Sequence, residues 1–463
     1  MTDSVVCADV GSTYTKVAAI DPESGKLLGA ASHPTTVSTD VLDGLAAALD
    51  ALRDQGIAVD GLDHPDLLVC SSAGGGLRLA VVGYERAITA EAGHRVGLSA
   101  GARIVHVAAG RLDPVARSAL AATRPDVVLL VGGTDGGNAD VLLHNATALG
   151  RARLRCPVVV AGNVDVREEV LARLTAAGVA AIATSNVLPK IGVLDPGPAR
   201  AVIREVFITH VIGGKGLSRG DRFAALVRAA TPDAVLAGVE LLADGAGAVR
   251  GAGDVLVVDV GGATSDVYSV VTPDPEDGAL RRDVVEHMWR GRTVEGDLGM
   301  RWSAPGVVEA ALAERLLVPG PATDALGEAA SARAADPGMV PDGESAATTD
   351  ARIAGLAATI ACRRHARPQV ITAAPGQVVR RGGADLRAVR LVVGSGGVLR
   401  HATEEVSRGV LQAVLGDTGG GWRLPEHPRL VIDSSYVLAA AGLLALDGRA
   451  ELAARLLASA LLG

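Results

Sequence analysis

The chain is constrained most by a short pattern that occurs twice, about 250 residues apart. An apolar run from Val5 to Val10 leads into Asp9 to Lys16, DVGSTYTK, and an apolar run from Val255 to Val260 leads into Asp259 to Val267, DVGGATSDV. In both copies an aspartate ends a strand and glycine turns the chain into hydroxyl residues, as at the tip of a β-hairpin. The duplication predicts two related domains that face each other.

The residues in the two turns suit the binding of a nucleoside triphosphate. Glycine lets phosphate oxygens approach backbone N–H groups, because no Cβ stands in the way. We therefore expect the nucleotide to contact the turn residues Gly11, Ser12, Thr13, Gly261, Gly262, Thr264 and Ser265. Across the space between the turns, Asp9 and Asp259 would hold Mg²⁺ chiefly through its waters, because magnesium gives up water reluctantly.

Two charged residues beside the turns each have two interpretations. Lys16 either approaches phosphate or is an ordinary exposed lysine of a strand. Asp266 either contributes to nucleotide and metal binding or holds the second hairpin by bonding backbone amides. The sequence leaves both pairs of alternatives open.

A third glycine-rich turn lies in the run Leu391 to His401, LVVGSGGVLRH. A buried strand is followed there by four small residues and then by a helix; the four are Gly394, Ser395, Gly396 and Gly397. Such a turn lets a flat ring or a phosphate lie on the backbone. Taken alone, it is equally well explained as a tight connection between a strand and a helix.

In this order and spacing, the three elements resemble the actin-like ATPase superfamily, which includes sugar kinases, actin and the heat-shock ATPases. The resemblance implies that Asp9 to Lys16 is the first phosphate motif, Asp259 to Asp266 the second, and Gly394 to Gly397 the adenosine motif. Six longer strings look like the MutL/GlmL family associated with glutamate mutase: ADVGSTYTK, LLVGGTDGGN, VVDVGGATSDVYSV, TVEGDLGMRWS, VGSGGVLRH and IDSSYVLAAAGLLA. Together they spread the resemblance over most of the chain outside 318–350.

That resemblance implies an ATP- and Mg²⁺-dependent accessory protein, which reactivates an adenosylcobalamin-dependent carbon-skeleton mutase by exchanging damaged cobalamin. Its partners would be the subunits of that mutase, and an oligomeric form stays an open alternative. The chain has no DxHxxG run, and His144 fails that pattern. We therefore expect the corrin to be bound by the partner, and not through a histidine of this chain.

Two other functions are compatible with the same fold. A small-molecule kinase would need a catalytic base in the cleft, for which Asp135 in the run VGGTDGG is the best candidate. The alternatives for Asp135 are that it positions the attacking water, that it reports the nucleotide state to the insertion, or that it merely shapes a sharp turn near a helix N-terminus. A filament-forming structural protein is the third alternative, and no sequence feature supports it.

The residue pattern along the chain predicts an α/β fold, and the resemblance implies that it forms two actin-like, ribonuclease H-like lobes with a nucleotide cleft between them. The first lobe, 1–250, would contain an α/β insertion near 66–193, where short apolar strands alternate with helices. The second lobe, 251–463, would contain a flexible loop near 318–350, rich in Pro, Ala, Gly and Asp, and closing helices at 434–463. The stretch from Arg222 to Ala243 is expected to be mainly helical.

Four further polar positions have open interpretations. Lys215 lies in a run of glycines that is explained as a helix C-cap or as a phosphate contact. Glu295 and Asp297 follow the second hairpin and are candidates for contacts with ribose or nucleotide. Asp433 ends a strand and is expected to cap the helix that follows it.

Composition excludes several other classes of protein. With 44 Lys and Arg against 52 Asp and Glu, and 2% aromatic residues, the chain offers neither a basic stripe nor a stacking platform for nucleic acid. No apolar stretch approaches the roughly 20 residues of a membrane span, and the N-terminus lacks the features of a signal peptide. We expect a cytoplasmic protein whose four scattered cysteines are reduced core thiols.

Overall fold

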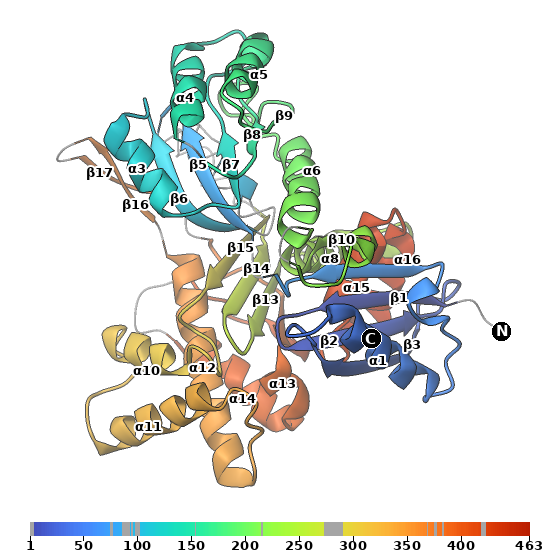
Figure 1. The fold of residues 1–463 in the computed structure, drawn as a ribbon. Helices are drawn as coiled ribbons and strands as arrows, with labels where there is room; N and C mark the ends of the chain where they lie inside the picture. Colours follow the sequence, from blue (N-terminus) through green and yellow to red (C-terminus); the bar gives the residue numbers. More distant parts are fainter. Residues whose placement is uncertain are drawn as a thin grey trace.

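The computed structural model describes residues 4–74, 77–85, 93, 96, 97, 102–152, 154–213, 216–272, 290–367, 369–374, 377–381, 384–417 and 423–463. Its framework is three five-stranded sheets, each covered by helices (Figure 1). Two of these sheets have the same strand order, and the third stands apart from them at the top of the view.

The first sheet contains the first of the two repeated hairpins. Its strands are β1 (Val5–Val10), β2 (Tyr14–Ile20), β3 (Leu27–Pro34), β4 (Leu67–Ser71) and β10 (Val227–Ala230). They lie in the order β10-β4-β1-β2-β3, with β1, β2 and β3 antiparallel and β1, β4 and β10 parallel. Helix α1 (Val41–Arg53) covers one face and begins at Asp40, whose carboxylate accepts a hydrogen bond from the N–H of Leu42 at 2.9 Å.

The second sheet repeats this arrangement strand for strand. Its members are β13 (Val255–Val260), β14 (Ser265–Val270), β15 (Arg290–Glu295), β18 (Leu391–Ser395) and β19 (Arg429–Ile432). The order β15-β14-β13-β18-β19 again places an antiparallel three-stranded meander beside two parallel strands. Because both sheets have the same topology around the repeated hairpin, the predicted fold of two actin-like lobes is confirmed.

In each lobe, the fifth strand leads into a helix, and these two helices pack against each other between the lobes. They are α8 (Thr231–Asp244), after β10, and α15 (Val437–Leu446), after β19. A Cβ at Gly442 would overlap the carbonyl oxygen of Ala234, and a Cβ at Gly238 would overlap that of Leu438. Each glycine therefore faces the carbonyl four residues before the other glycine, so the crossing has a local twofold symmetry.

The layer formed by α8, α15 and α16 (Ala450–Leu457) shares one apolar core with both lobes. Alternate residues of β1, such as Val5 and Cys7, face this layer, and so do Val255 and Val257 of β13. We propose that the boundary between the two lobes lies between residues 250 and 251. Helices in 434–463 nevertheless pack on the first sheet as well as the second.

The insertion has its own parallel sheet. Its strands are β5 (Arg78–Gly83), β6 (Arg103–Ala109), β7 (Val127–Leu130), β8 (Val158–Val160) and β9 (Ala181–Ala183), in the order β6-β5-β7-β8-β9. Helices α3 (Pro114–Ala122), α4 (Asp140–Arg151) and α5 (Arg167–Ala176) cover one face (Figure 1). The expected start of the insertion near residue 66 is wrong, because β4 pairs with β1 in the first sheet and the separate sheet begins only at β5.

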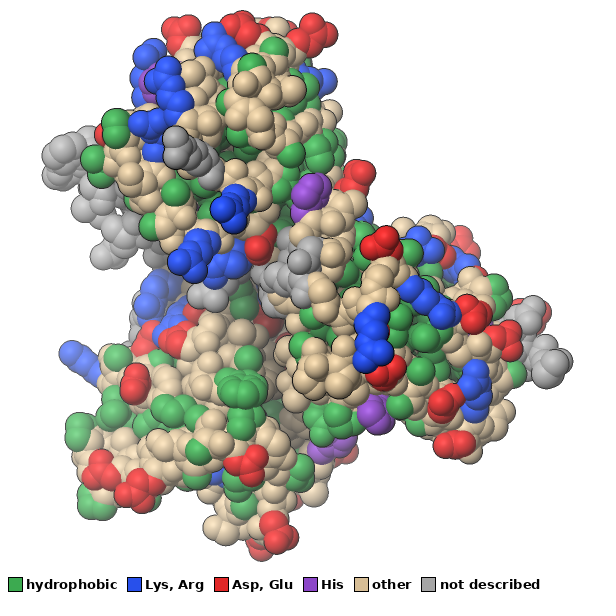
Figure 2. Space-filling model, in the orientation of Figure 1, with side chains coloured by type: hydrophobic (Ala, Val, Ile, Leu, Met, Phe, Trp, Pro, Cys, Tyr) green, Lys and Arg blue, Asp and Glu red, His purple; other side chains and the backbone are tan. Residues whose placement is uncertain are grey.

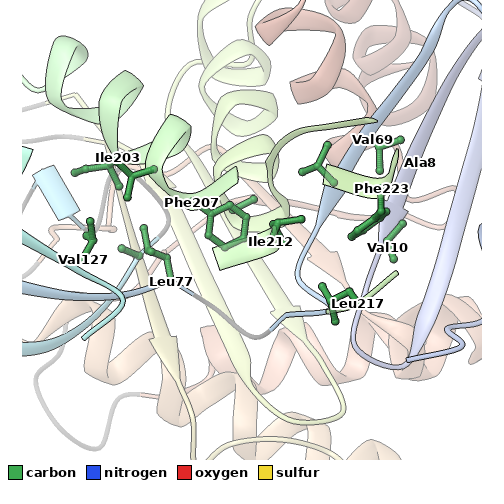
Figure 3. Close-up of a cluster of buried hydrophobic side chains, with 14 of the residues drawn as sticks. Ala8, Val10, Val69, Leu77, Val127, Ile203, Phe207, Ile212, Leu217 and Phe223 are labelled. Atoms are coloured by element: carbon green, nitrogen blue, oxygen red, sulfur yellow. The ribbon is translucent and has the colours of Figure 1, made fainter. Parts of the chain in front are cut away.

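The insertion is joined to the first lobe by a continuous apolar core. After helix α6 (Gly197–Val206), the π-helical segment η3 (Phe207–Ile212) and the short helix α7 (Arg222–Leu226) bring the chain back to β10. Figure 3 shows Phe207 and Ile212 between Leu77 and Val127 on one side and Val10 on the other. Since these buried side chains form one cluster, the inserted sheet is packed on the first lobe and is not merely tethered to it.

Two predictions about the chain between sheets are wrong. The stretch from Arg222 to Ala243 is not mainly helical, because β10 interrupts it and completes the first sheet. The segment 318–350 is not a flexible loop: it holds α11 (Pro321–Ala335) and the start of α12 (Glu344–Ala366). Helix α11 shows no apolar period because it buries Thr323, Leu326, Ala330 and Arg333, the last paired with the buried Asp350.

The remaining described elements include those that complete the second lobe around α12. Those of the second lobe are α10 (Ala304–Ala313), β16 (Gln369–Ala374), β17 (Gln377–Arg381), α13 (Gly397–His401) and α14 (Glu404–Leu415). The short elements η1 (Gly61–Asp63), η2 (Val164–Val166), β11 (Gly245–Ala246) and β12 (Val249–Arg250) precede the second lobe, and η4 (Ala458–Leu462) ends the chain. No described helix has the length and apolar character that a membrane span requires. All four cysteines are free; Cys7, Cys70 and Cys362 are buried as predicted for core thiols, whereas Cys156 is only partly buried.

A buried histidine makes the stability of the second lobe dependent on pH. His365 in α12 lies 2.8 Å from the Ser269 hydroxyl and 2.9 Å from the Thr293 hydroxyl, and burial lowers its pKa to about 4. Between pH 6.5 and 4 the unfolded chain binds a proton at this position that the folded chain does not, so stability falls as the pH falls. We expect His365→Gln to remove up to about 3 kcal/mol of this loss.

Urea unfolding at pH 7 and pH 4.5 tests this expectation. The wild type should lose more free energy of unfolding between the two pH values than His365→Gln does. Equal losses in both proteins would show that His365 does not titrate in the way its burial indicates.

Candidate nucleotide site

The tips of the two repeated hairpins have the same backbone geometry. The Gly11 N–H donates to the carbonyl of Tyr14 at 3.1 Å, and the Gly261 N–H donates to the carbonyl of Thr264 at 2.9 Å. A Cβ on Gly11 would lie 2.8 Å from the Tyr14 oxygen, and one on Gly261 would lie 2.9 Å from the Thr264 oxygen. Both turns therefore exclude larger residues at this position. Ser12 and Thr13 are exposed at the first tip.

Asp9 is held by three neighbours at the end of β1. Its carboxylate accepts a hydrogen bond from the Thr231 hydroxyl at 2.5 Å and one from the Cys70 thiol at 3.7 Å. Its other oxygen lies 3.6 Å from the Lys16 ammonium, directly across the β1–β2 pair. Asp9 is 5% exposed, so these contacts fix its orientation.

The carboxylate of Asp259, the counterpart of Asp9 in the second lobe, makes no hydrogen bond or ion pair within the described residues. Its pKa is raised to about 7, chiefly by burial. The Lys16 charge lowers this pKa, and the charges of Asp266, Asp9 and Asp433 raise it. The strand ends of the two lobes lie close together, because the Lys16 ammonium of the first lobe is 3.5 Å from the ring centroid of Tyr436, which follows β19 of the second.

Within the second hairpin, two candidate side chains are already engaged by the protein. Asp266 pairs with the buried Arg292 of β15, and its second oxygen accepts from the Thr264 hydroxyl at 3.2 Å. Asp266 thus holds the hairpin as one alternative predicted, although its main partner is a guanidinium and not backbone amides. The Ser265 hydroxyl donates to the carbonyl of Leu298 and is fully buried.

The glycine turn after β18 wraps around Asp259. Ser395 pairs with Asp259 in the parallel β13–β18 ladder. Gly396 has a φ of 105°, a conformation that favours glycine, and a Cβ there would overlap the carbonyl oxygen of Val260 and lie 3.0 Å from Asp259 Oδ1. Gly394 is close to apolar side chains, whereas nothing lies within 4 Å of a Cβ at Gly397. The predicted third motif therefore adjoins the second hairpin.

Tyr436 is a site residue that the sequence interpretation missed. Its ring lies between two cations, 3.5 Å from the Lys16 ammonium and 5.6 Å from the Arg400 guanidinium. Its backbone has a φ of 58°, which is strained for a bulky residue. Beside Asp9, Lys16 and Tyr436 there is a cavity of only about 20 Å³, the space of one water. Tyr436 therefore closes the first hairpin over its lysine. In the sequence, Tyr436 directly follows Asp433, Ser434 and Ser435, the residues between β19 and α15, and this position is the feature that could have identified it.

Asp433 occupies the position equivalent to Thr231, at the start of the helix after the fifth strand. Its buried carboxylate accepts hydrogen bonds from the N–H groups of Val437 at 2.8 Å and Leu438 at 3.2 Å, so the predicted cap of α15 is confirmed. Burial raises the pKa of Asp433, while these hydrogen bonds lower it.

Glu295 and Asp297 are paired with a guanidinium. Arg364 of α12 lies 2.7 Å from Glu295 and 2.8 Å and 2.9 Å from the two oxygens of Asp297. Hydrogen bonding to Arg364 lowers the pKa of Asp297, whereas burial raises that of Glu295. Neither carboxylate is therefore free to contact ribose in this conformation.

Asp135 lies in the insertion. It accepts hydrogen bonds from the Asn186 amide at 2.8 Å and from the Val164 N–H at 3.2 Å, both of which belong to the same inserted sheet and its loops. These contacts favour the interpretation of Asp135 as a residue that shapes a turn. Lys215 lies outside the described residues.

The donor set of the site suits a cation that brings most of its own ligands. Within the described residues, no group of three or more His, Cys, Asp or Glu side chains is arranged to hold a metal ion. Asp259 nevertheless offers a carboxylate without a partner, close to Asp9. Magnesium, which keeps several waters and is commonly bound by one or two carboxylates plus phosphates, fits this arrangement.

Comparison with known proteins gives one family and one close relative. The family model described as MutL protein matches residues 5–461. "Protein MutL" of Clostridium tetanomorphum is 36% identical over 450 residues, which cover 96% of this chain and 96% of that protein.

Solved structures resemble the chain at low identity. They include a ROK hexokinase from Thermus thermophilus, with a TM-score of 0.26, 15% identity and coverage of 98% of this chain and 97% of that one. The ethanolamine utilization protein EutJ from Carboxydothermus hydrogenoformans has a TM-score of 0.27, 9% identity and coverage of 98% and 89%. The xylulose kinase from Bifidobacterium adolescentis has a TM-score of 0.30, 11% identity and coverage of 99% and 93%.

Proposed function

Since this chain belongs to the MutL protein family, we propose that it is an ATP-dependent accessory protein of an adenosylcobalamin-dependent carbon-skeleton mutase of the glutamate mutase type. In this role it exchanges damaged cobalamin on the mutase for intact coenzyme. The protein acts as an ATPase and a reactivation factor, and its partners are the mutase subunits.

One observation carries the nucleotide part of this proposal. Two hairpin tips of the same geometry, one from each lobe, place Asp9 and Asp259 close together, and Asp259 has no partner among the described residues. A half-buried carboxylate without a partner and with a raised pKa destabilises the fold, so its presence favours a role in binding a cation. The family membership supports the choice of mutase.

Particular residues of the chain would hold Mg-ATP. The N–H groups of the two tips, at Gly11 to Thr13 and Gly261 to Thr264, would bind phosphate oxygens, and the turn at Gly394 to Gly397 would carry the adenosine. Asp9 and Asp259 would hold the waters of Mg²⁺. When bound, the nucleotide would supply a cleavable phosphoanhydride, and the residues of both tips would hold its phosphates.

Lys16 and Tyr436 would respond to the nucleotide. In the structure the Lys16 ammonium is occupied by Asp9 and by the Tyr436 ring. For Lys16 to bind phosphate, the Tyr436 ring has to leave it, and Tyr436 directly precedes α15. Nucleotide binding would thereby change the equilibrium between two arrangements of the lobes around the α8–α15 crossing, through contacts that differ between those arrangements.

Release of cobalamin from the mutase tests the function. A glutamate mutase inactivated with bound, damaged cobalamin is mixed with this protein and Mg-ATP, and free corrin is measured by its absorbance after rapid gel filtration. We expect release with Mg-ATP and, at most, one tenth of that rate without nucleotide or with Asp9→Ala.

The controls separate the alternatives. Asp9→Ala must show the circular dichroism and melting behaviour of a folded protein. If the folded wild type releases no corrin, the assignment to a glutamate-type mutase is wrong. A screen of small-molecule acceptors with labelled ATP would then test the alternative of a small-molecule kinase on the same fold.

A further inference from the structure

A second cavity, away from the hairpins, lies on the outer surface of the insertion. Its volume is about 700 Å³, within the range of sites for small molecules. Its walls are the loop before α3, the first half of α3, one side of α4 and Arg173 of α5. Figure 2 shows that basic side chains and a histidine gather over α3 and α4, on the upper left of the molecule.

One wall of this cavity is fixed by a buried amide. Asn145 of α4 is fully buried, accepts a hydrogen bond from the Leu112 N–H at 2.9 Å and donates to the Gly110 carbonyl at 2.9 Å. His144, the next residue, lies 3.4 Å from the Leu112 carbonyl and lines the cavity. The loop that carries Arg111 is thus tied to α4 in a defined position, as a preformed binding site requires.

The charge of the lining is unbalanced. Four arginines line the cavity against two aspartates, Asp113 and Asp140. The Asp113 carboxylate is used to cap α3, where it accepts from the Ala116 N–H at 2.7 Å. Arg173 is paired with Glu169.

The other three arginines, Arg111, Arg117 and Arg151, make no ion pair within the described residues. In addition, Arg117 Nε is buried without a hydrogen-bond partner. Arg111 and Arg151 are exposed and Arg117 is half-buried, so three positive charges without a paired carboxylate meet at one cavity in a chain whose net charge is −8. The guanidinium groups of these arginines would form charge-assisted hydrogen bonds with an anion in the cavity, and such bonds are stronger than neutral ones.

We propose that this cavity of the insertion binds a small molecule that carries at least two phosphate or carboxylate groups. An arginine guanidinium forms bidentate hydrogen bonds with either a phosphate or a carboxylate. Three guanidinium groups, from the loop, α3 and α4, surround this cavity. The site is separate from the hairpins and does not depend on the proposed mutase role. Its ligand would be sensed by the insertion, which shares an apolar core with the first lobe.

Isothermal titration calorimetry with two probes, inorganic pyrophosphate and citrate, tests the proposal at 0.15 M NaCl without Mg²⁺. At least one probe should bind the wild type saturably with one site and a Kd below about 1 mM, an affinity that a few charge-assisted hydrogen bonds provide. The double variant Arg117→Gln/Arg151→Gln should bind it at least 10-fold more weakly. The better probe identifies the ligand as a phosphate or as a polycarboxylate.

Two controls locate the binding. Arg250→Gln/Arg352→Gln removes the same charge from exposed positions elsewhere and should bind the probe within twofold of the wild type. Lys16→Gln removes the lysine of the first hairpin and should also leave probe binding unchanged. The proposal is overturned if neither probe binds, if the cavity variant binds as well as the wild type, or if Lys16→Gln abolishes binding.

Discussion

Asp259→Asn is expected to reduce Mg-dependent ATP hydrolysis at least 100-fold and, at pH 8, to make the protein more stable. The loss follows because the amide cannot replace the anionic carboxylate that would hold the waters of the metal. The gain follows from the pKa of Asp259, raised from 3.8 to about 7 by burial and by neighbouring carboxylates. Between these pH values the folded chain keeps a proton on Asp259 that the unfolded chain releases, so the free energy of unfolding falls as the pH rises. Above pH 7 the whole of this loss is present.

Thermal melting and a phosphate-release assay measure both effects on the same samples. The stabilisation should be about 1 to 4 kcal/mol at pH 8 and should disappear below pH 4. Asp266→Asn, which changes the direct cross-strand partner of Asp259, is the matched control. It should destabilise the protein by about 3 kcal/mol, because it removes the carboxylate that neutralises the buried Arg292. An Asp259→Asn variant that retains full ATPase activity would exclude this residue from the metal site.

Gly442→Ala is expected to destabilise the whole protein by about 3 kcal/mol or more. The added methyl group overlaps the carbonyl oxygen of Ala234, which belongs to the backbone of α8 and cannot rotate away. The two helices must separate to admit it, and they are the shared layer of both lobes. Gly238→Ala should have a similar effect, and the double variant should lose less than the sum, since helices already separated accept the second methyl group more easily.

Chemical unfolding followed by circular dichroism measures these losses. Gly327→Ala is the control, because no atom lies within 4 Å of a Cβ there and the residue is within α11. That change should stabilise the protein by up to about 1 kcal/mol. If Gly442→Ala were as harmless as Gly327→Ala, the close contact between α8 and α15 would be wrong.

The parts of the fold that were predicted correctly follow from strong local patterns. The strands Val5 to Val10 and Val255 to Val260 are mostly apolar on both faces and end in glycine turns. This pattern is typical of strands buried in the middle of a sheet. The duplication then gave the relation between the lobes without any long-range information. The Asp433 cap was predictable because a side-chain acceptor at a helix start satisfies N–H groups that would otherwise lack partners.

The parts that were missed depend on tertiary contacts. Strand β10 is four residues long between two helices, and only its pairing with β4 makes it a strand. Helix α11 buries an arginine, which no apolar period reveals, because Asp350 pairs with it from another helix. Tyr436 and Lys16 are in contact but lie more than 400 positions apart in the sequence, so no local pattern predicts the contact.

The shared helical layer also determines when the first lobe can fold on the ribosome. Cys7 of β1 contacts the carbonyl of Ala440 in α15, and 433 residues separate them along the chain. Until α15 leaves the ribosome, the face of the first sheet that carries Val5, Cys7 and Ile20 has no complete cover. Nascent chains that contain only the first lobe therefore expose apolar surface throughout the synthesis of the second, and holding chaperones would have to protect them during elongation.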